Sequence, residues 1–205
     1  MDYAKEYSYL HQQFPKFFAG WTLKRYVDDV ANACKAHDAK TLLDYGSGKG
    51  YQYLVRRSHD KWNSCPHCGR GVLPTLYDVG VRQLQERPTG TFDGVICTDM
   101  LEHIEEVDVA RILDDLVGYA NKFLVLGISC KPEQPQDTKR LSDGRGVHVT
   151  VKLPEWWSAR IKDTLRRAGK SVVVYAIYEP LEGPLVRETI SWALVTYAGA
   201  DAVRL

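Results

Sequence analysis

Residues 41–50 read TLLDYGSGKG, an apolar run that ends in an acid and continues into three glycines at alternate positions. The run before Asp44 predicts a buried strand that stops at a carboxylate. Because glycine accepts positive φ and lets a ligand lie directly on the backbone, Gly46, Gly48 and Gly50 predict a tight turn into a helix. The N–H groups at a helix start lack partners within the helix, and they bind anionic and nucleotide-like ligands. We therefore expect a ligand-binding turn here.

The rest of the chain alternates between helical and strand patterns. Apolar spacing predicts helices over 17–37, 51–57, 79–87, 105–122 and 154–168. It predicts further strands over 74–77, 92–99, 123–129, 172–178 and 190–197. This alternation, without an internal repeat or a domain boundary, favours a single α/β domain over residues 1–205.

Three segments stand outside this alternation. Residues 1–16 form an N-terminal extension, which we interpret as a loosely docked terminus rather than as a short helix over a cleft. Residues 59–73 form an inserted loop that contains two cysteines. Residues 131–150 form a long polar loop, and loops of this length are uncommon unless they are functional. We expect this last loop to shape a substrate pocket.

The composition is that of an ordinary soluble globular protein. The 205 residues are 44% hydrophobic and 26% charged, with a formal net charge of +1. This balance indicates neither a general nucleic-acid surface nor a membrane surface. There is no apolar signal core and no apolar run of membrane length, and five cysteines do not suggest a secreted disulfide framework. We expect a cytoplasmic, reduced protein, and the sequence leaves its oligomeric state open.

The strand, the acid and the Gly-x-Gly-x-Gly turn closely resemble the first motif of class I S-adenosylmethionine-dependent methyltransferases. The resemblance implies a Rossmann-like fold with a mainly parallel sheet and an antiparallel last strand. It also implies that the glycines hold the methionine part of the donor, and that an acid ending the second strand, Asp78, holds its ribose. The donor-binding residues implied are Asp44, Gly46, Gly48, Gly50, Asp78, Thr98 and Asp99.

The chain departs from the family plan after Asp78. Only residues 88–91 separate the predicted helix 79–87 from the strand that begins at Phe92, so the third strand and its helix are missing or abbreviated. Two other interpretations of the glycine turn are a plain strand-to-helix turn and a nicotinamide dinucleotide site. A P-loop is excluded, because Lys49 is followed by Gly50 rather than by Ser or Thr.

A second group of chemistry-bearing residues follows the predicted strand 92–99. Asp99, Glu102 and His103 would share one helical turn, where Asp99 and Glu102 could also form a capping box. With His148 from the long loop, this pattern is similar to that of small-RNA 2′-O-methyltransferases and ubiquinone-pathway O-methyltransferases. The resemblance to the RNA enzymes implies that Asp99, Glu102, His103 and His148 hold Mg²⁺ or another divalent cation, although Asp99 stands where those enzymes have Glu. Without a metal, His103 or His148 would act as the base.

The sequence Cys65-Pro66-His67-Cys68 looks like half of a zinc ribbon. A Cys-x-x-Cys turn is a good metal chelate, but a structural zinc site needs four ligands. The other cysteines are isolated in the sequence, so we interpret this segment as an unmetallated surface loop, with zinc at Cys65 and Cys68 as the alternative.

These patterns predict S-adenosylmethionine-dependent methyl transfer, preferentially to oxygen, with His103, His148 and Asp99 as catalytic residues. The acceptor is a small molecule or a nucleotide. Two alternatives remain: transfer of another group of the donor, such as aminocarboxypropyl, and a non-catalytic module that binds S-adenosylmethionine.

Overall fold

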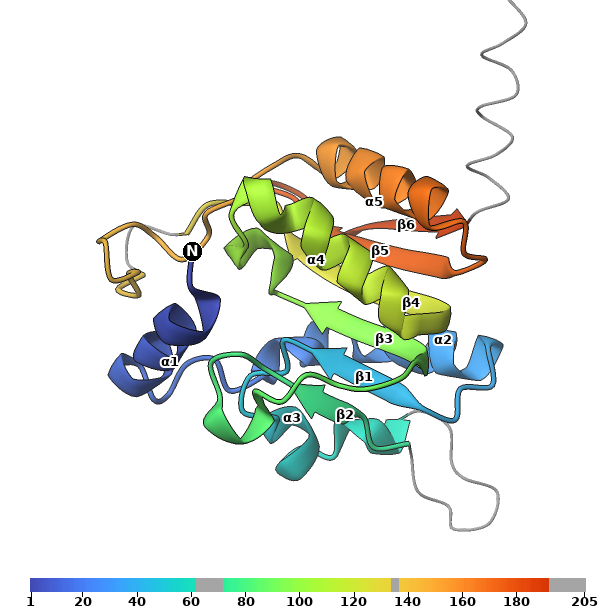
Figure 1. Ribbon diagram of the computed structural model, residues 1–205, viewed down its shortest axis with the longest axis horizontal. Coiled ribbons are helices and arrows are strands. Elements are labelled where there is room, and N and C mark those ends of the chain that lie inside the picture. Colours follow the sequence, from blue (N-terminus) through green and yellow to red (C-terminus); the bar gives the residue numbers. More distant parts are fainter. Residues whose placement is uncertain (62–71, 134–136, 192–205) are drawn as a thin grey trace, which may run out of the picture.

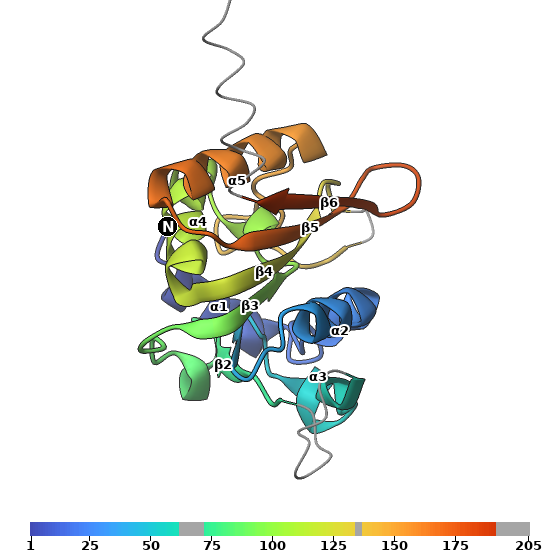
Figure 2. The same cartoon turned by 90° about the vertical axis from the view of Figure 1, so that its right-hand side faces the viewer.

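The predicted alternation of strands and helices folds into one six-stranded sheet with helices on both faces (Figures 1 and 2). The computed structural model describes residues 1–61, 72–133 and 137–191. Its strands are β1 (Leu42–Tyr45), β2 (Thr75–Tyr77), β3 (Phe92–Thr98), β4 (Ala120–Ser129), β5 (Val173–Glu179) and β6 (Val186–Ser191). Its α-helices are α1 (Tyr3–Gln13), α2 (Val27–Ala36), α3 (Tyr51–Leu54), α4 (Glu106–Tyr119) and α5 (Pro154–Ala168). Its 3₁₀ helices are η1 (Trp21–Arg25), η2 (Ser58–Lys61), η3 (Arg82–Leu84) and η4 (Leu101–His103).

The sheet has the order β2-β1-β3-β4-β5-β6. All neighbouring strands run parallel except β6, which is antiparallel to β5. This confirms the predicted Rossmann-like class with an antiparallel last strand. The connection from β1 leads to β2 on one side, while β3 returns on the other side. That reversal is the point at which open α/β sheets bind ligands, outside the carboxyl ends of their strands.

Two apolar layers hold the sheet between its helices. On one face, α4 and α5 pack on the sheet through residues such as Leu116 and Trp157, which are both fully buried. On the other face, α2 packs through Val30 against Leu42 and Val125. Because parallel strands are covered on both faces, their residues are buried throughout rather than alternately, as all four residues of β1 are.

Helix α5 and strand β5 follow the prediction closely, whereas β6 begins at Val186, four residues before the predicted start of the last strand at residue 190. Helix α5 begins with Pro154 in its first turn and ends before Gly169, which takes a φ of 61°. Both residues suit these ends, since proline fits the first turn and glycine accepts the left-handed conformation. The prediction for 105–122 extends too far, because Ala120 already has the extended backbone that starts β4.

The N-terminal half differs more from the prediction. The predicted helix 17–37 is interrupted at Gly20, whose φ is 85°, and continues as η1 and then α2. The predicted helix 51–57 is reduced to α3, and 79–87 contains only η3. Residues 78–91 form no strand, as expected for an abbreviated third-strand region.

The interpretation of residues 1–16 as a loosely docked terminus is wrong. Residues 3–13 form α1, which Asp2 caps by accepting a hydrogen bond from the Lys5 N–H, 3.1 Å away. The helix is held down by Leu10, which is fully buried in a small cluster with Leu141 and Val147 of the long loop. The N-terminal helix and the 131–150 loop therefore pack together.

Some predictions concern residues that the structure does not describe. Cys65, His67 and Cys68 lie outside the described residues, as does the part of the predicted strand 190–197 beyond residue 191. None of the helices in the described ranges combines the length and the apolar character needed to cross a membrane.

Candidate functional site

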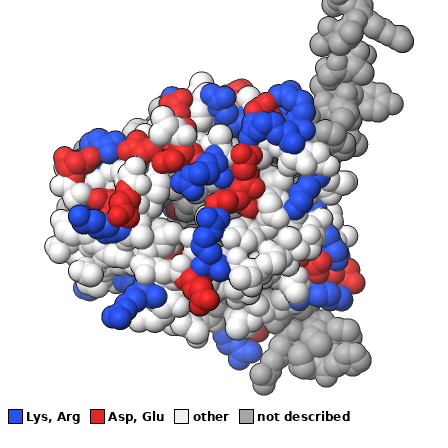
Figure 3. Space-filling model, viewed as in Figure 1, with Lys and Arg blue, Asp and Glu red and all other residues white. Residues whose placement is uncertain are grey.

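A cavity of about 690 Å³ lies at the carboxyl ends of the parallel strands. Each of these strands contributes residues at or just after its end, namely Tyr45 and Gly46, Tyr77 and Asp78, Thr98 and Asp99, Ser129, and Glu179. The space-filling view shows a hollow in this face, with basic and acidic side chains around it (Figure 3). The cavity thus occupies the ligand position that the sheet topology favours.

The glycine turn forms part of the cavity wall. Gly46 and Gly48 line the cavity, with φ values of 83° and 57°. A Cβ on Gly46 would lie 2.7 Å from the Met100 side chain, and one on Gly48 would lie 2.4 Å from the Phe18 carbonyl oxygen. Gly50 is not among the lining residues, and its own left-handed backbone serves the turn instead. The structure therefore brings two of the three predicted glycines to the cavity.

The N–H groups of the turn are paired, and the first N–H of the helix that follows, that of Tyr51, is not the open donor expected there, because it donates to the Ala19 carbonyl at 3.1 Å. The N–H groups of Gly46 and Ser47 donate to the Tyr77 carbonyl, at 2.8 and 3.1 Å. The Lys49 N–H donates to the Phe18 carbonyl at 3.1 Å. Helix α3, which follows, has only four residues. The turn therefore contributes backbone without bulky side chains to the cavity wall, and it does not contribute a series of unpaired N–H groups.

Asp44 lies behind the glycine turn and does not line the cavity. Its buried carboxylate accepts hydrogen bonds from the Tyr53 hydroxyl at 2.8 Å and from Gln52 Nε2 at 3.0 Å. Burial raises the pKa of Asp44 to about 7, against the opposing effect of these two hydrogen bonds. Asp44 is therefore not positioned to make the contact with S-adenosylmethionine in the cavity that the sequence had predicted. It links α3 to β1 instead.

Asp78 ends β2 and lines the cavity, as predicted. Its two oxygens accept hydrogen bonds from the N–H groups of Gly48 and Gly80, both at 2.8 Å. His11 Nε2 of α1 lies 3.8 Å from the Asp78 carboxylate. The acid therefore couples the glycine turn to the loop after β2, and α1 lies over it.

Thr98 and Asp99 end β3 and line the cavity. Asp99 has a φ of 49°, a left-handed backbone that is unusual outside glycine and that accumulates at functional sites. Its carboxylate accepts a hydrogen bond from the Tyr26 hydroxyl at 3.1 Å. Burial raises the pKa of Asp99, and the positive charge of Arg25 opposes this effect.

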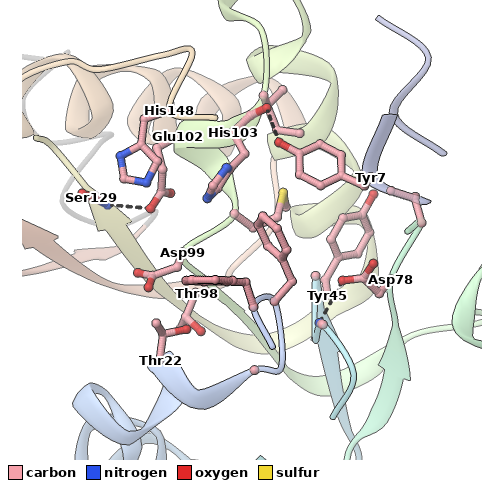
Figure 4. Close-up of a pocket in the computed structure, with 18 of the residues that line it drawn as sticks. Tyr7, Thr22, Tyr45, Asp78, Thr98, Asp99, Glu102, His103, Ser129 and His148 are labelled. Carbon is pink, nitrogen blue, oxygen red and sulfur yellow. Dashed lines mark hydrogen bonds between the residues drawn. The ribbon is translucent and has the colours of Figure 1, made fainter. Parts of the chain in front are cut away.

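Glu102, His103 and His148 form the one group in the described part of the chain that could jointly hold a metal ion. One ligand atom from each lies within 4.8 Å of the others. Figure 4 shows the three side chains together, with Asp99 next to them and Asp78 on the far side of the cavity. The structure thus brings together three of the four predicted ligands, while Asp99 lies outside the group.

The hydrogen bonds around this cluster orient its ligand atoms. His148 Nδ1 lies 3.0 Å from the carbonyl oxygen of Lys131. Since a carbonyl only accepts, Nδ1 carries the proton, and the neutral ring has its lone pair on Nε2. A backbone carbonyl on one ring nitrogen is the usual partner of a metal-binding histidine.

Several polar atoms at the cluster have no partner within the described structure: Glu102 Oε2, His103 Nδ1 and Ser129 Oγ. Burial and the negative charge of Asp99 raise the pKa of Glu102 well above its usual range. Burial, with help from His148 and Lys139, lowers the pKa of His103 to about 3. A buried carboxyl oxygen and a buried imidazole nitrogen without hydrogen-bond partners suit a small divalent cation, whose charge would favour the ionised form of Glu102, so the residues present fit a metal.

Residues of α1 complete the cavity, and the sequence interpretation missed them. Tyr3, Tyr7 and His11 line the cavity, and the Tyr7 hydroxyl donates to the His103 carbonyl at 3.2 Å. Their spacing of four residues was a visible signal, because it places all three on one helical face. The polar neighbours between them obscured that signal.

The chain matches no model of a known protein family, and no curated protein sequence matches it.

Proposed function

We propose that this protein is an S-adenosylmethionine-dependent methyltransferase that transfers the methyl group to an oxygen of a small molecule or a nucleotide. The observation that carries the proposal is a single cavity that joins the glycine turn after β1 to the cluster of Glu102, His103 and His148. A donor held at the turn would then meet an acceptor held at the cluster. Proximity of this kind lowers the barrier of a two-substrate reaction.

The donor fits the strand ends on the glycine side. Gly46 and Gly48 line the part of the cavity that would receive the methionine part, and Asp78 follows the second strand, where the resemblance expects the ribose acid. Asp99 provides a carboxylate for the amino group of the donor, next to Thr98. The contacts of Asp78 with backbone N–H groups keep its carboxylate in place for a ribose hydroxyl.

The cluster can supply the base for this reaction. The acceptor oxygen attacks the methyl carbon, the carbon–sulfur bond breaks, and its electron pair returns to the sulfur, which becomes a neutral thioether. The hydroxyl proton passes to a base. His148 suits this role because its Nε2 carries the lone pair, whereas His103 is a weak base with a pKa of about 3.

A divalent cation would fit between Glu102, His103 and His148. When bound, such an ion would lower the pKa of an acceptor hydroxyl and fix its orientation. In that case both imidazoles would serve as ligands and the proton would pass to solvent.

Calorimetric titration of the protein with S-adenosylmethionine tests the donor, and titration with Mn²⁺ or Mg²⁺ tests the cluster. We expect donor binding, and metal binding that falls about tenfold or more in Glu102→Gln, as for the loss of a charged ligand. Glu182→Gln, which alters an exposed carboxylate in the turn before β6, is the matched control.

Three outcomes would count against parts of the proposal. No donor binding at millimolar concentration overturns the cofactor. Unchanged metal affinity in Glu102→Gln and in His148→Ala removes the metal. Release of methylthioadenosine rather than S-adenosylhomocysteine, with a panel of hydroxylated small molecules and nucleotides, indicates aminocarboxypropyl transfer.

A further inference from the structure

The charges that line the cavity differ in whether they are neutralised. Six basic side chains line it: Lys16, Arg25, Arg87, Arg111, Lys131 and Lys139. Arg25 and Lys131 both pair with Glu179, at 2.8 and 2.7 Å. Arg87 pairs with Asp115 at 2.7 Å and Arg111 with Asp108 at 3.5 Å. Lys16 and Lys139 have no ion pair within the residues that the structure describes.

Aromatic rings hold Lys139 in place of a carboxylate. Its ammonium lies 5.5 Å from the ring centre of Phe17 and 5.5 Å from that of Phe18. A cation–π contact positions an ammonium without neutralising it, so its N–H donors remain open to an anion. Phe18 has a φ of 52°, and its carbonyl accepts the Lys49 N–H. The glycine turn therefore fixes the backbone that presents this ring.

Glu133 of the same loop has partners other than Lys139. Glu133 and Asp137 line the cavity. The Glu133 carboxylate accepts the Val147 N–H at 2.9 Å and lies 3.8 Å from Arg140. In the described part of the chain, no ion pair joins Glu133 to Lys139.

The lysine lies on the acceptor side of the cavity. The Phe18 ring that it contacts is 6.4 Å from the His103 ring, and the His103 ring is 4.9 Å from that of His148. A molecule whose hydroxyl lies at the cluster of Glu102, His103 and His148 therefore passes beside Phe18. Its outer end then lies near Lys139, and Lys16, which precedes Phe17 in the chain, lines the same cavity.

We propose that the methyl acceptor carries an anionic group, a phosphate or a carboxylate, which binds Lys139 and Lys16 at the mouth of the cavity while the acceptor hydroxyl lies at the cluster. The inference rests on the proposed function, because it assigns the acceptor side of that same cavity. A charged hydrogen bond to a phosphate or a carboxylate is roughly twice as strong as a neutral one, which makes this contact a determinant of acceptor choice.

Two pairs of probes test the charge and its chemical source. The protein, saturated with S-adenosylhomocysteine, is titrated calorimetrically with uridine 5′-monophosphate against uridine, and with 3,4-dihydroxybenzoate against catechol. We expect the anionic member of at least one pair to bind about tenfold or more tightly than its neutral partner, as for gain of a charge-assisted hydrogen bond. The pair that shows the preference identifies phosphate or carboxylate as the recognised group.

Substitution of the lysines tests whether Lys139 and Lys16 cause the preference for the anionic probe. Lys139→Met and Lys16→Met keep the aliphatic stem and remove the charge, so the preference should fall several-fold in each and vanish in the double variant. Lys35→Met makes the same change on the exposed last turn of α2 and should leave the preference intact. Unchanged S-adenosylhomocysteine affinity in each variant shows that the cavity is still formed.

The inference is overturned if no probe pair shows an anion preference, which includes the absence of binding by all four probes at 10 mM. It is equally overturned if the preference survives in the double variant. Failure of the unsubstituted protein to bind S-adenosylhomocysteine is a different result, because it overturns the proposed function itself.

Discussion

At the scale of single residues, two neighbouring acids at strand ends have opposite surroundings. Asp44 of β1 lies outside the cavity wall and accepts hydrogen bonds from Tyr53 and Gln52. Asp99, which follows β3, lines the cavity. Asp44 is buried and Asp99 is half-buried, and partial removal from water disfavours the charged form of each. The difference is that a ligand can reach Asp99, while Asp44 has only protein around it.

Asp44 should make the stability of the protein depend on pH. Its folded pKa of about 7 exceeds the ordinary value of 3.8, so the folded protein binds more protons than the unfolded chain between these values. The free energy of unfolding therefore falls as pH rises through this window. Asp44→Asn stays neutral, and we expect its stability relative to the unsubstituted protein to rise by about 2–4 kcal/mol between pH 4 and pH 8.

Urea unfolding at pH 4 and pH 8 measures this difference. Asp28→Asn, which alters a highly exposed carboxylate on α2, is the control and should show little change with pH. An Asp44→Asn difference that is the same at both pH values would mean that Asp44 is ionised in the folded protein without cost.

At the scale of elements, the approach of α2 to β4 determines where Asp99 is held. Tyr26 precedes α2, and its ring lies over Gly127 of β4, where a Cβ would come within 2.7 Å of the ring. The hydroxyl at the end of that ring donates to Asp99. The missing side chain at Gly127 therefore lets a helix on one face of the sheet support a carboxylate in the cavity.

We expect two glycine-to-alanine substitutions to change the free energy of unfolding in opposite directions, because the space around the two glycines differs. Gly127→Ala must displace the buried Tyr26 ring, and we expect a loss of about 1–3 kcal/mol in the free energy of unfolding. Gly118→Ala lies within α4 with nothing within 4 Å of the added Cβ, and should gain about 0.5–1 kcal/mol. Urea unfolding of both variants measures the two effects, and equal signs would contradict this account of the α2–β4 packing.

At the scale of the whole molecule, the cavity unites segments that are far apart in the chain. Strand ends form its floor, and α1 covers Asp78 from above. Helix α1 also packs with the 131–150 loop through Leu10 and Val147. A ligand in this cavity contacts parts that unfolding separates, so its binding must stabilise the folded protein as a whole.

Thermal unfolding with ligand tests this linkage and the identity of the donor together. S-adenosylhomocysteine at one hundred times its dissociation constant should add about 2.7 kcal/mol to the free energy of unfolding. For a protein of this size, that corresponds to an increase in Tm of about 5–10 °C. NAD⁺ at the same concentration should leave Tm unchanged, whereas a larger shift with NAD⁺ would favour the nicotinamide dinucleotide interpretation of the glycine turn.

Much of the fold was predictable because its signals are local. The apolar run before Asp44, the apolar face of α4, and Pro154 and Gly169 at the ends of α5 act within a few residues. The short helices were not predictable to the same degree. Their lengths depend on contacts such as that of Gly20 with Gln52, where an added Cβ would clash, rather than on their own spacing.

The sequence by itself determined that this protein has an α/β sheet with a glycine turn after its first strand, and which acids and histidines follow the later strands. Tertiary structure decided which of them share a cavity. It left Asp44 and Gly50 out of the cavity wall, satisfied the N–H groups of the turn, and brought His148 to Glu102 and His103. The physical reason is range: strand and turn preferences arise between near neighbours, whereas burial, hydrogen-bond partners and charge neutralisation depend on segments that meet only when the chain has folded.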